Sequence, residues 1–180
     1  RDADLIVFCS PVQTIAQLAM EMSPHLKPGC LVTDVGSTKE TLVLDMEKFI
    51  PDGISFIGAH PIAGGEMSGF RLSSDTLFDD AHCIITPTDK SDPESLKIAI
   101  ELWKTIGMHV SIMDAKEHDF IFGAVSHLPH VLIFALMNTL GDLKSENYDR
   151  ITSFSGAGLR DITRTAASEP AMWRDICLSN

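Results

Sequence analysis

The feature that most constrains the fold is a regular alternation of short apolar runs and longer amphipathic stretches from Asp4 to Met113. Each apolar run is nearly continuous, which is typical of parallel strands buried on both faces of a sheet. The runs are Asp4–Cys9, Cys30–Val35, Ser55–Ala59, His82–Thr86 and Val110–Met113. The stretches with apolar residues at helical spacing are Thr14–Met22, Lys39–Phe49 and Pro93–Ile106. This βαβ rhythm predicts an α/β fold with a Rossmann-like, doubly wound and mostly parallel sheet.

The rhythm changes after Asp114. From Ala115 to Leu140 no strand-like alternation remains, and helix-forming residues are interrupted only at Ser126–His130. We therefore predict that residues 1–114 form the later part of a dinucleotide-binding domain and that residues 115–180 begin an all-helical domain. The sequence contains no G-x-G-x-x-G turn, the usual pyrophosphate cradle of such domains. We expect the opening βαβ unit to lie outside this chain.

The composition argues against several classes of function. The formal net charge of −11 disfavours a nucleic-acid partner, because phosphate binding rests on clustered Lys and Arg. No stretch approaches the roughly 20 uninterrupted apolar residues of a membrane span, so we expect no membrane partner. The four cysteines are far apart and show no C-x-x-C pairing. This pattern predicts reduced thiols in a cytoplasmic protein and no zinc site.

Two polar segments follow predicted strands, where open α/β sheets bind their ligands. Asp34–Lys39 ends one strand and opens a helix, so Ser37 is either a ligand contact or an ordinary N-cap, with Glu40 completing the cap. His60 follows the next strand and precedes a Gly-rich loop. It is either a proton acceptor facing the same crevice or a structural histidine. The residues alone leave both alternatives open.

The helical part contributes a second set of candidates. His127 and His130 could share a helix face, but no Glu, Asp or Cys supplies a third metal ligand at the required spacing. Arg164 offers a planar fork for a carboxylate, although its spacing from Asp161 also fits a solvated ion pair. Trp173 either walls the same pocket or fills the core. We expect the remaining histidines at the surface or at strand ends: His25, His82, His109 and His118.

In this order the motifs resemble one family, the prephenate and arogenate dehydrogenases. The matching segments cover nearly the whole chain. They are SPV at Ser10–Val12, DVGSTK at Asp34–Lys39, GAHPIAGGEMSG at Gly58–Gly69, SHLPH at Ser126–His130, LRDITR at Leu159–Arg164 and AMWRDI at Ala171–Ile176. One departure from the commonest family pattern is Gly65, where many members have Thr. A side-chain hydroxyl contact to substrate is therefore not expected from this loop.

The resemblance implies a role for each matching residue. His60 corresponds to the catalytic histidine that takes the proton of the substrate's ring hydroxyl, and Ser37 to a serine beside that histidine and the nicotinamide. Arg164 corresponds to the arginine that binds a substrate carboxylate. The substrate pocket would further include His130, Asp161, Trp173 and Gly65. The cofactor would be contacted by Ser10, Pro11, Asp34, Gly36 and Ser37.

The implied activity is oxidative decarboxylation of prephenate to 4-hydroxyphenylpyruvate, or of arogenate to tyrosine, with hydride transfer to NAD or NADP in tyrosine biosynthesis. The implied assembly is a homodimer through the helical domain, without a metal. The choice between NAD and NADP stays open, because the residue that recognises the 2′ position of the ribose belongs to the opening βαβ unit.

One alternative function is that of a β-hydroxyacid dehydrogenase, which would use a lysine of the helical domain; here no lysine occurs between Lys116 and Lys144. The other is a non-catalytic module that senses tyrosine or a nucleotide.

Overall fold

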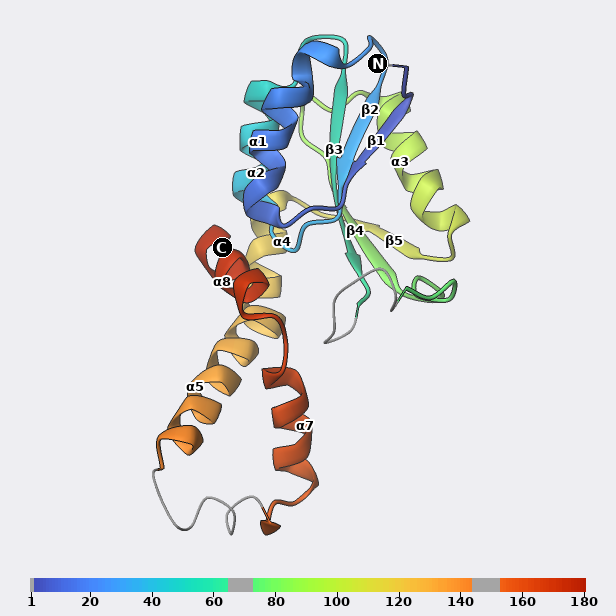
Figure 1. The fold of residues 1–180 in the computed structure, drawn as a ribbon. Helices are drawn as coiled ribbons and strands as arrows, with labels where there is room; N and C mark the ends of the chain where they lie inside the picture. Colours follow the sequence, from blue (N-terminus) through green and yellow to red (C-terminus); the bar gives the residue numbers. More distant parts are fainter. Residues whose placement is uncertain (1, 65–72, 144–152) are drawn as a thin grey trace.

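The computed structural model describes residues 2–64, 73–143 and 153–180 (Figure 1). A five-stranded sheet in the order β1-β2-β3-β4-β5 forms its larger part. The strands are β1 (Leu5–Phe8), β2 (Leu31–Asp34), β3 (Ser55–Ile62), β4 (His82–Thr86) and β5 (His109–Ile112). The first three run parallel, β4 is antiparallel to β3, and β5 is parallel to β4. The predicted α/β class with a mostly parallel sheet is confirmed.

Helices cover both faces of this sheet (Figure 1). One face carries α1 (Val12–Met22), continued by the short 3₁₀ turn η1 (Ser23–His25), and α2 (Glu40–Phe49); the other carries α3 (Pro93–Thr105). Because successive side chains of a strand point to opposite faces, Leu31 packs in the core under α3 while Val32 packs in the core under α1 and α2. All four residues of β2 are buried. Burial on both faces explains why the strands appear in the sequence as continuous apolar runs.

The described helical part contains α4 (Ala115–Phe122), η3 (Gly123–His127), α5 (Leu128–Asp142), α7 (Ala157–Ala166) and α8 (Pro170–Ser179). Asp114 caps α4, since its carboxylate accepts the backbone N–H groups of Lys116 and Glu117. The interruption predicted at Ser126–His130 is a π-helical turn rather than a break, and the helix continues directly into α5. Pro129 lacks the N–H that a regular α-helical turn would use, which accounts for the local change in hydrogen bonding.

Helix α8 returns from the helical part to the loops that follow β1 and β2 (Figure 1). Gln13 of α1 donates a hydrogen bond from its Nε2 to Ser179 Oγ at 2.7 Å. Asn180 Nδ2, at the end of α8, donates to the backbone carbonyl of Asp119 at 2.7 Å. The contact of Gln13 joins the sheet-containing part of the chain to α8, and the contact of Asn180 ties the end of α8 to α4.

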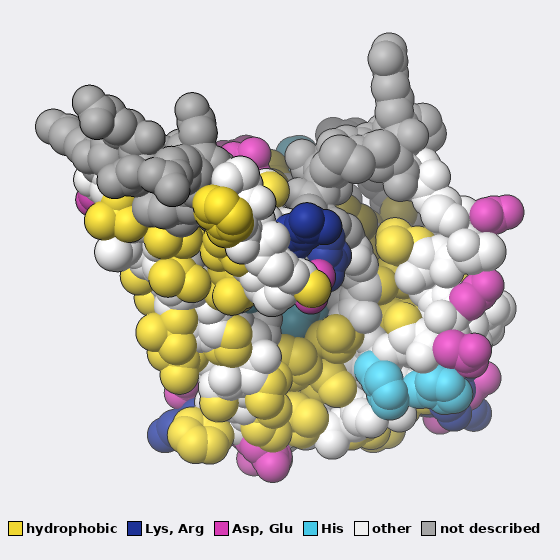
Figure 2. Space-filling view, turned by 90° about the horizontal axis from the view of Figure 1, so that it is seen from below, with side chains coloured by type: hydrophobic (Ala, Val, Ile, Leu, Met, Phe, Trp, Pro, Cys, Tyr) yellow, Lys and Arg dark blue, Asp and Glu magenta, His cyan; other side chains and the backbone are white. Residues whose placement is uncertain are grey.

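The continuous helix from Ala115 to Asp142 exposes a long apolar surface. Phe120, Val125 and Leu132 are 78%, 66% and 61% exposed, and Figure 2 shows hydrophobic side chains gathered over the helical side of the molecule. By length and composition this helix could cross a membrane: its most apolar window has a mean hydropathy of 1.9. The predicted absence of a membrane partner therefore stays a prediction. Exposed apolar surface of this extent marks an interface with another molecule.

Candidate functional site

A buried carboxylate organises the loop after β2. Asp34, the last residue of that strand, is fully buried and forms an ion pair with Lys39, whose side chain is also fully buried. The same carboxylate accepts the backbone N–H of Gly36 at 2.7 Å and that of Ala59, in β3, at 3.1 Å. Asp34 thus fixes the loop against the neighbouring strand. Its side chain lies beneath the surface of the loop rather than at it.

The glycine of this loop is required by close contact. A Cβ atom at Gly36 would lie 2.9 Å from Asp34 Oδ2 and 3.3 Å from Val12 Cγ2. Any side chain there would press on the buried carboxylate. The loop therefore approaches α1 closely, and its outer surface is available to a ligand.

Four of the five predicted cofactor residues line one cavity of about 430 Å³. Ser10 and Pro11 come from the loop after β1, and Gly36 and Ser37 from the loop after β2. The opposite wall is formed by residues of α8 and the residue before it: Glu169, Ala171, Met172, Asp175 and Ile176. The cavity therefore lies between the carboxyl ends of two parallel strands and the helical part, where open α/β sheets bind their ligands.

The hydroxyl groups of this cavity are suited to a polar ligand. Ser10 Oγ is buried and has no hydrogen-bond partner within residues 2–64, 73–143 and 153–180. A buried hydroxyl without a partner costs free energy, so a ligand that hydrogen-bonds it would bind favourably. Ser37 is not the N-cap of α2, because Lys39 holds that position without a side-chain cap. Of the two alternatives for Ser37, the helix cap is excluded and the ligand contact stays a prediction.

His60 lies within β3 and not beyond its end. The strand runs on from the predicted end at Ala59 to Ile62, because the antiparallel β4 continues to pair with it, and His60 is opposite Ile84. Its side chain is only 9% exposed and packs against the rings of His118 and Phe122 in α4. The imidazole is therefore held in a largely dry environment between the sheet and the helical part.

His118 is the main candidate that sequence reasoning missed. Its side chain is fully buried, so the expectation of a surface or strand-end position was wrong. Its Nε2 lies 2.8 Å from His60 Nδ1, and its Nδ1 lies 2.8 Å from Asp119 Oδ1. One signal was present in the sequence: Ala115, His118 and Phe122 are spaced as one face of a helix. That face packs inward.

Asp119 completes this chain of contacts and also caps α2. Its Oδ1 accepts the backbone N–H of Lys39 at 2.7 Å, and its Oδ2 accepts that of Glu40 at 2.9 Å. Burial alone would raise the pKa of this carboxyl, but the hydrogen bonds from His118 and from these two N–H groups hold the pKa below its ordinary value. Asp119 is therefore a carboxylate that only accepts hydrogen bonds.

His60 is held in its neutral form. Burial is the largest cause, and the charge of Lys39 adds to it, followed by His118 and His127; together they lower the pKa of His60 to about 2. A cationic imidazole would have to lose most of its hydration here while facing the buried ammonium of Lys39. Only the neutral form can accept a proton.

A second cluster joins α5 to α8. The imidazole of His130 stacks on the indole of Trp173, with ring centroids 3.5 Å apart and an angle of 18° between the planes. His130 Nδ1 lies 2.9 Å from the backbone carbonyl of Ser126, which can only accept, so Nδ1 carries the proton in a neutral ring and Nε2 is available as an acceptor. Burial lowers the pKa of His127, whose Nδ1 is 2.9 Å from Asn180 Nδ2.

The remaining predicted residues are distributed as follows. Arg164 and Asp161 lie on α7 with exposed side chains, and neither lines the cavity beside Ser37. Figure 2 shows Lys or Arg side chains beside the hollow at the centre of the face that it presents. The prediction for Gly65 falls outside the described residues. No cluster of His, Cys, Asp and Glu that could hold a metal ion occurs in the described part of the chain.

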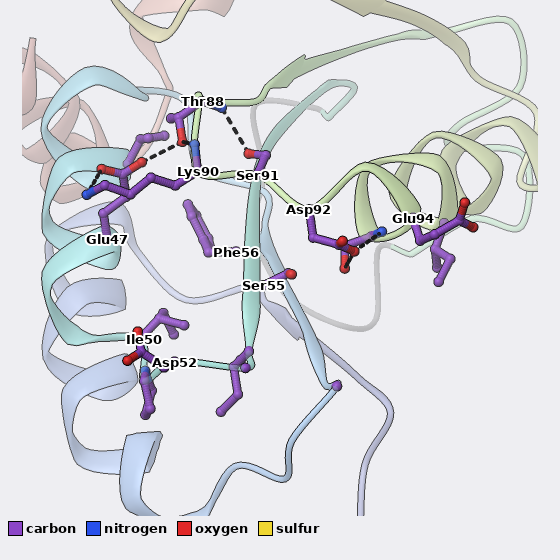
Figure 3. A pocket seen from close by; sticks show the side chains of 17 residues that line it. Glu47, Ile50, Asp52, Ser55, Phe56, Thr88, Lys90, Ser91, Asp92 and Glu94 are labelled. Atoms are coloured by element: carbon purple, nitrogen blue, oxygen red, sulfur yellow. Dashed lines mark hydrogen bonds and ion pairs between the residues drawn. The ribbon is translucent and has the colours of Figure 1, made fainter.

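A larger cavity of about 600 Å³ lies at the other end of β3, beside Ser55 and Phe56 (Figure 3). In this cavity Glu47 accepts hydrogen bonds from Thr88 and from Lys90. No histidine or cysteine lines it. The smaller cavity lies at the carboxyl ends of β1 and β2 and is lined by Ser10, Gly36 and Ser37, so it is the candidate active site. His60 is not one of its lining residues and lies on the neighbouring strand β3.

Comparisons with known proteins match both parts of the chain. Residues 1–112 match the family model of the prephenate dehydrogenase nucleotide-binding domain, and residues 114–180 match that of the prephenate dehydrogenase dimerization domain. The whole chain aligns with the prephenate dehydrogenase of Bacillus subtilis at 36% sequence identity, and the alignment covers 48% of that protein. It also aligns with the cyclohexadienyl dehydrogenase of Zymomonas mobilis at 33% identity, over 61% of that protein. The chain thus spans about half to three fifths of the length of these relatives.

A solved structure of prephenate dehydrogenase from Aquifex aeolicus, in complex with hydroxyphenyl propionate and NAD+, superimposes with a TM-score of 0.90 at 42% identity. The match covers 97% of this chain and 60% of that one. Arogenate dehydrogenase from Synechocystis gives a TM-score of 0.78 at 27% identity, over 99% of this chain and 66% of that one. The chain described here belongs to the prephenate dehydrogenase family.

Proposed function

We propose that the protein containing this chain oxidatively decarboxylates prephenate or arogenate and transfers a hydride to NAD or NADP, as a cytoplasmic enzyme of tyrosine biosynthesis. One observation carries the proposal: a neutral, buried imidazole, His60, lies on the strand next to the loop whose Ser37 lines a cavity at the carboxyl ends of β1 and β2. The family membership supports the same activity. The Aquifex aeolicus relative, solved with NAD+, supports the cofactor class.

The chemistry of the reaction requires a base at the position of His60. When bound, the oxidised nicotinamide supplies the hydride acceptor. Loss of hydride from the carbon that bears the hydroxyl builds positive charge on the substrate, and His60 offsets that charge by accepting the hydroxyl proton. When CO₂ departs, its bonding electron pair stays in the ring, which becomes aromatic, and the phenolate oxygen takes the proton back from His60. Because the site is largely dry, this proton transfer would be favoured over exchange with water.

The other predicted residues divide between cofactor and substrate. Ser10, Pro11, Gly36 and Ser37 would contact the cofactor, and Asp34 would hold their loop in shape from beneath. Arg164 would bind a substrate carboxylate through its planar guanidinium. The pocket would be further lined or braced by His130, Asp161, Trp173 and Gly65.

The assembly that fits the helical part is a homodimer. The apolar surface of α5 needs a partner, and residues 114–180 match a dimerization domain. Such a dimer would cover that surface without a membrane. The two alternative functions are less well supported, since no observation favours a β-hydroxyacid dehydrogenase or a non-catalytic sensor over the family that both halves of the chain match.

The test is a steady-state assay of the full-length protein with prephenate and arogenate, each with NAD+ and NADP+. We expect reduced cofactor and CO₂ to appear in equal amounts for at least one pair. Absence of turnover with all four pairs, in a folded protein, would contradict the proposal. His82→Asn is the matched control for changes at His60, because His82 is an exposed histidine on the neighbouring strand.

A further inference from the structure

The contacts of His60 fix which of its two nitrogens can act as a base. Asp119 is a carboxylate that only accepts hydrogen bonds, so the proton shared between it and His118 Nδ1, 2.8 Å away, belongs to His118. When His118 is neutral, its single proton is on Nδ1, and its Nε2 carries a lone pair. The atom facing that lone pair at 2.8 Å, His60 Nδ1, must be the donor. Neutral His60 therefore carries its proton on Nδ1 and its lone pair on Nε2.

We propose that His118 and Asp119 are positioning residues that hold His60 in the tautomer with a basic Nε2, and this inference rests on the proposed function. In this arrangement neither contacts the basic Nε2 of His60, because His118 contacts the opposite nitrogen, Nδ1, and Asp119 contacts His118. Without an acceptor at Nδ1, the proton of His60 could move to Nε2, and the ring could turn. Either change removes the lone pair that takes the proton.

The packing around the pair is rigid enough for this role. His118 is fully buried and stacks on Phe122, with ring centroids 4.5 Å apart and 30° between the planes. Asp119 is tied to the start of α2 by two backbone N–H groups. His118 and Asp119 are thus held by packing and by hydrogen bonds, which is the condition for keeping a catalytic group in a fixed orientation.

The decisive variants differ at His118 in the full-length enzyme. His118→Phe keeps an aromatic ring against Phe122 but offers no acceptor to His60 Nδ1. We expect kcat to fall by roughly 10²- to 10⁴-fold, the range for loss of a positioned base, with KM changed by less than about 3-fold. His118→Gln can present its Oε1 near the place of the lost Nε2 and should recover at least about 10-fold of that loss.

A spectroscopic readout separates positioning from general damage. Nitrogen-15 NMR of histidine-labelled enzyme, with His60 assigned by the signal lost in His60→Asn, should show a protonated Nδ1 and an unprotonated Nε2. His118→Phe should shift His60 towards protonated Nε2, and His118→Gln should restore the original pattern. Asp119→Asn should shift the tautomer as well as lower stability. Asp92→Ala, which removes the side-chain cap of the distant α3, should lower stability without moving the His60 signals.

The outcomes are distinguishable. If His118→Phe folds and keeps both the kcat and the His60 tautomer of the unchanged enzyme, the positioning role is wrong. If His118→Phe does not fold, His118→Gln decides the matter: loss of the Nδ1-protonated form there, despite the amide oxygen, would also overturn it. If the unchanged protein has the predicted tautomer but turns over neither substrate, the proposed function fails while the hydrogen-bond assignment stands.

Discussion

Lys39, at the start of α2, and Asp34, at the end of β2, form an ion pair in which both side chains are completely buried. Burial lowers the pKa of Lys39, although the charge of Asp34 and its hydrogen bond oppose that shift. The pair lies directly beneath the loop that carries Gly36 and Ser37, and Lys39 also faces His60. Its integrity is therefore a condition for the shape of the candidate site.

Removing one partner of this pair should destabilise the protein strongly. Lys39→Met leaves the carboxylate of Asp34 buried and uncompensated, and we expect a loss of about 3 to 5 kcal/mol in the free energy of unfolding, measured by urea denaturation. The control is Lys48→Met in the same helix, where an exposed pair with Asp45 should contribute about 1 kcal/mol or less. Equal losses of free energy of unfolding in the two variants would show that the buried pair stabilises the protein no more than the exposed pair does.

Gly58 should not tolerate a side chain. A Cβ atom there would lie 2.5 Å from Thr86 Oγ1 and 3.1 Å from Val43 Cγ2. We expect Gly58→Ala to lower the free energy of unfolding by about 1 to 3 kcal/mol, because β3 and β4 would have to move apart. Gly141→Ala in α5, where a Cβ meets nothing within 4 Å in the described residues, should be neutral or stabilising. A neutral Gly58→Ala would contradict the register of β3 and β4.

The lowered pKa of His60 predicts a pH dependence of stability. The folded protein keeps this imidazole neutral down to a pKa of about 2, whereas the unfolded chain takes up a proton near pH 6.5. Below pH 6.5 the unfolded state thus binds more protons than the folded state. The contribution of His60 to the free energy of unfolding is therefore fully present above that pH and decreases as the pH falls below it. The contribution is at most about 1.4 kcal/mol for each pH unit.

His60→Asn should reduce the change of the free energy of unfolding with pH. Urea denaturation at several values between pH 5 and pH 8 measures it, with His82→Asn as the exposed control. A residual slope of the same sign is expected from His127, because burial lowers its pKa too. If His60→Asn and the unchanged protein lost stability in parallel, His60 would not be the neutral buried group described here.

His60 and Arg164 should give different kinetic signatures in the full-length enzyme. His60→Asn removes a base that acts in the transition state, so kcat should fall by roughly 10²- to 10⁴-fold with little change in KM. Arg164→Gln removes a charge-assisted hydrogen bond worth about 1.5 to 3 kcal/mol, so KM should rise by roughly 10- to 150-fold. A near-normal kcat in His60→Asn would refute the proposed mechanism while leaving the family assignment intact.

Much of the fold followed from local patterns. The strand at Cys30–Val35 was predictable because a strand buried on both faces needs apolar residues at nearly every position. Ser37 was a candidate because its segment follows a predicted strand of an open α/β sheet, and Ser10 and Gly36 were candidates through the family resemblance. The structure places all three on one cavity. His60 was recognisable from its motif, although the strand that carries it is longer than expected.

The amino-acid sequence by itself therefore determined the βαβ order, the change to helices after Asp114 and the motifs of the site, all of which are encoded over a few neighbouring residues. Only the tertiary structure decided that His118 is buried, that it meets His60, and that Asp119 caps α2. A histidine in an isolated helix has no preferred partner. Its burial and its tautomer arise only when α4 packs against β3 and α2, because the partner atoms belong to residues far apart in the chain.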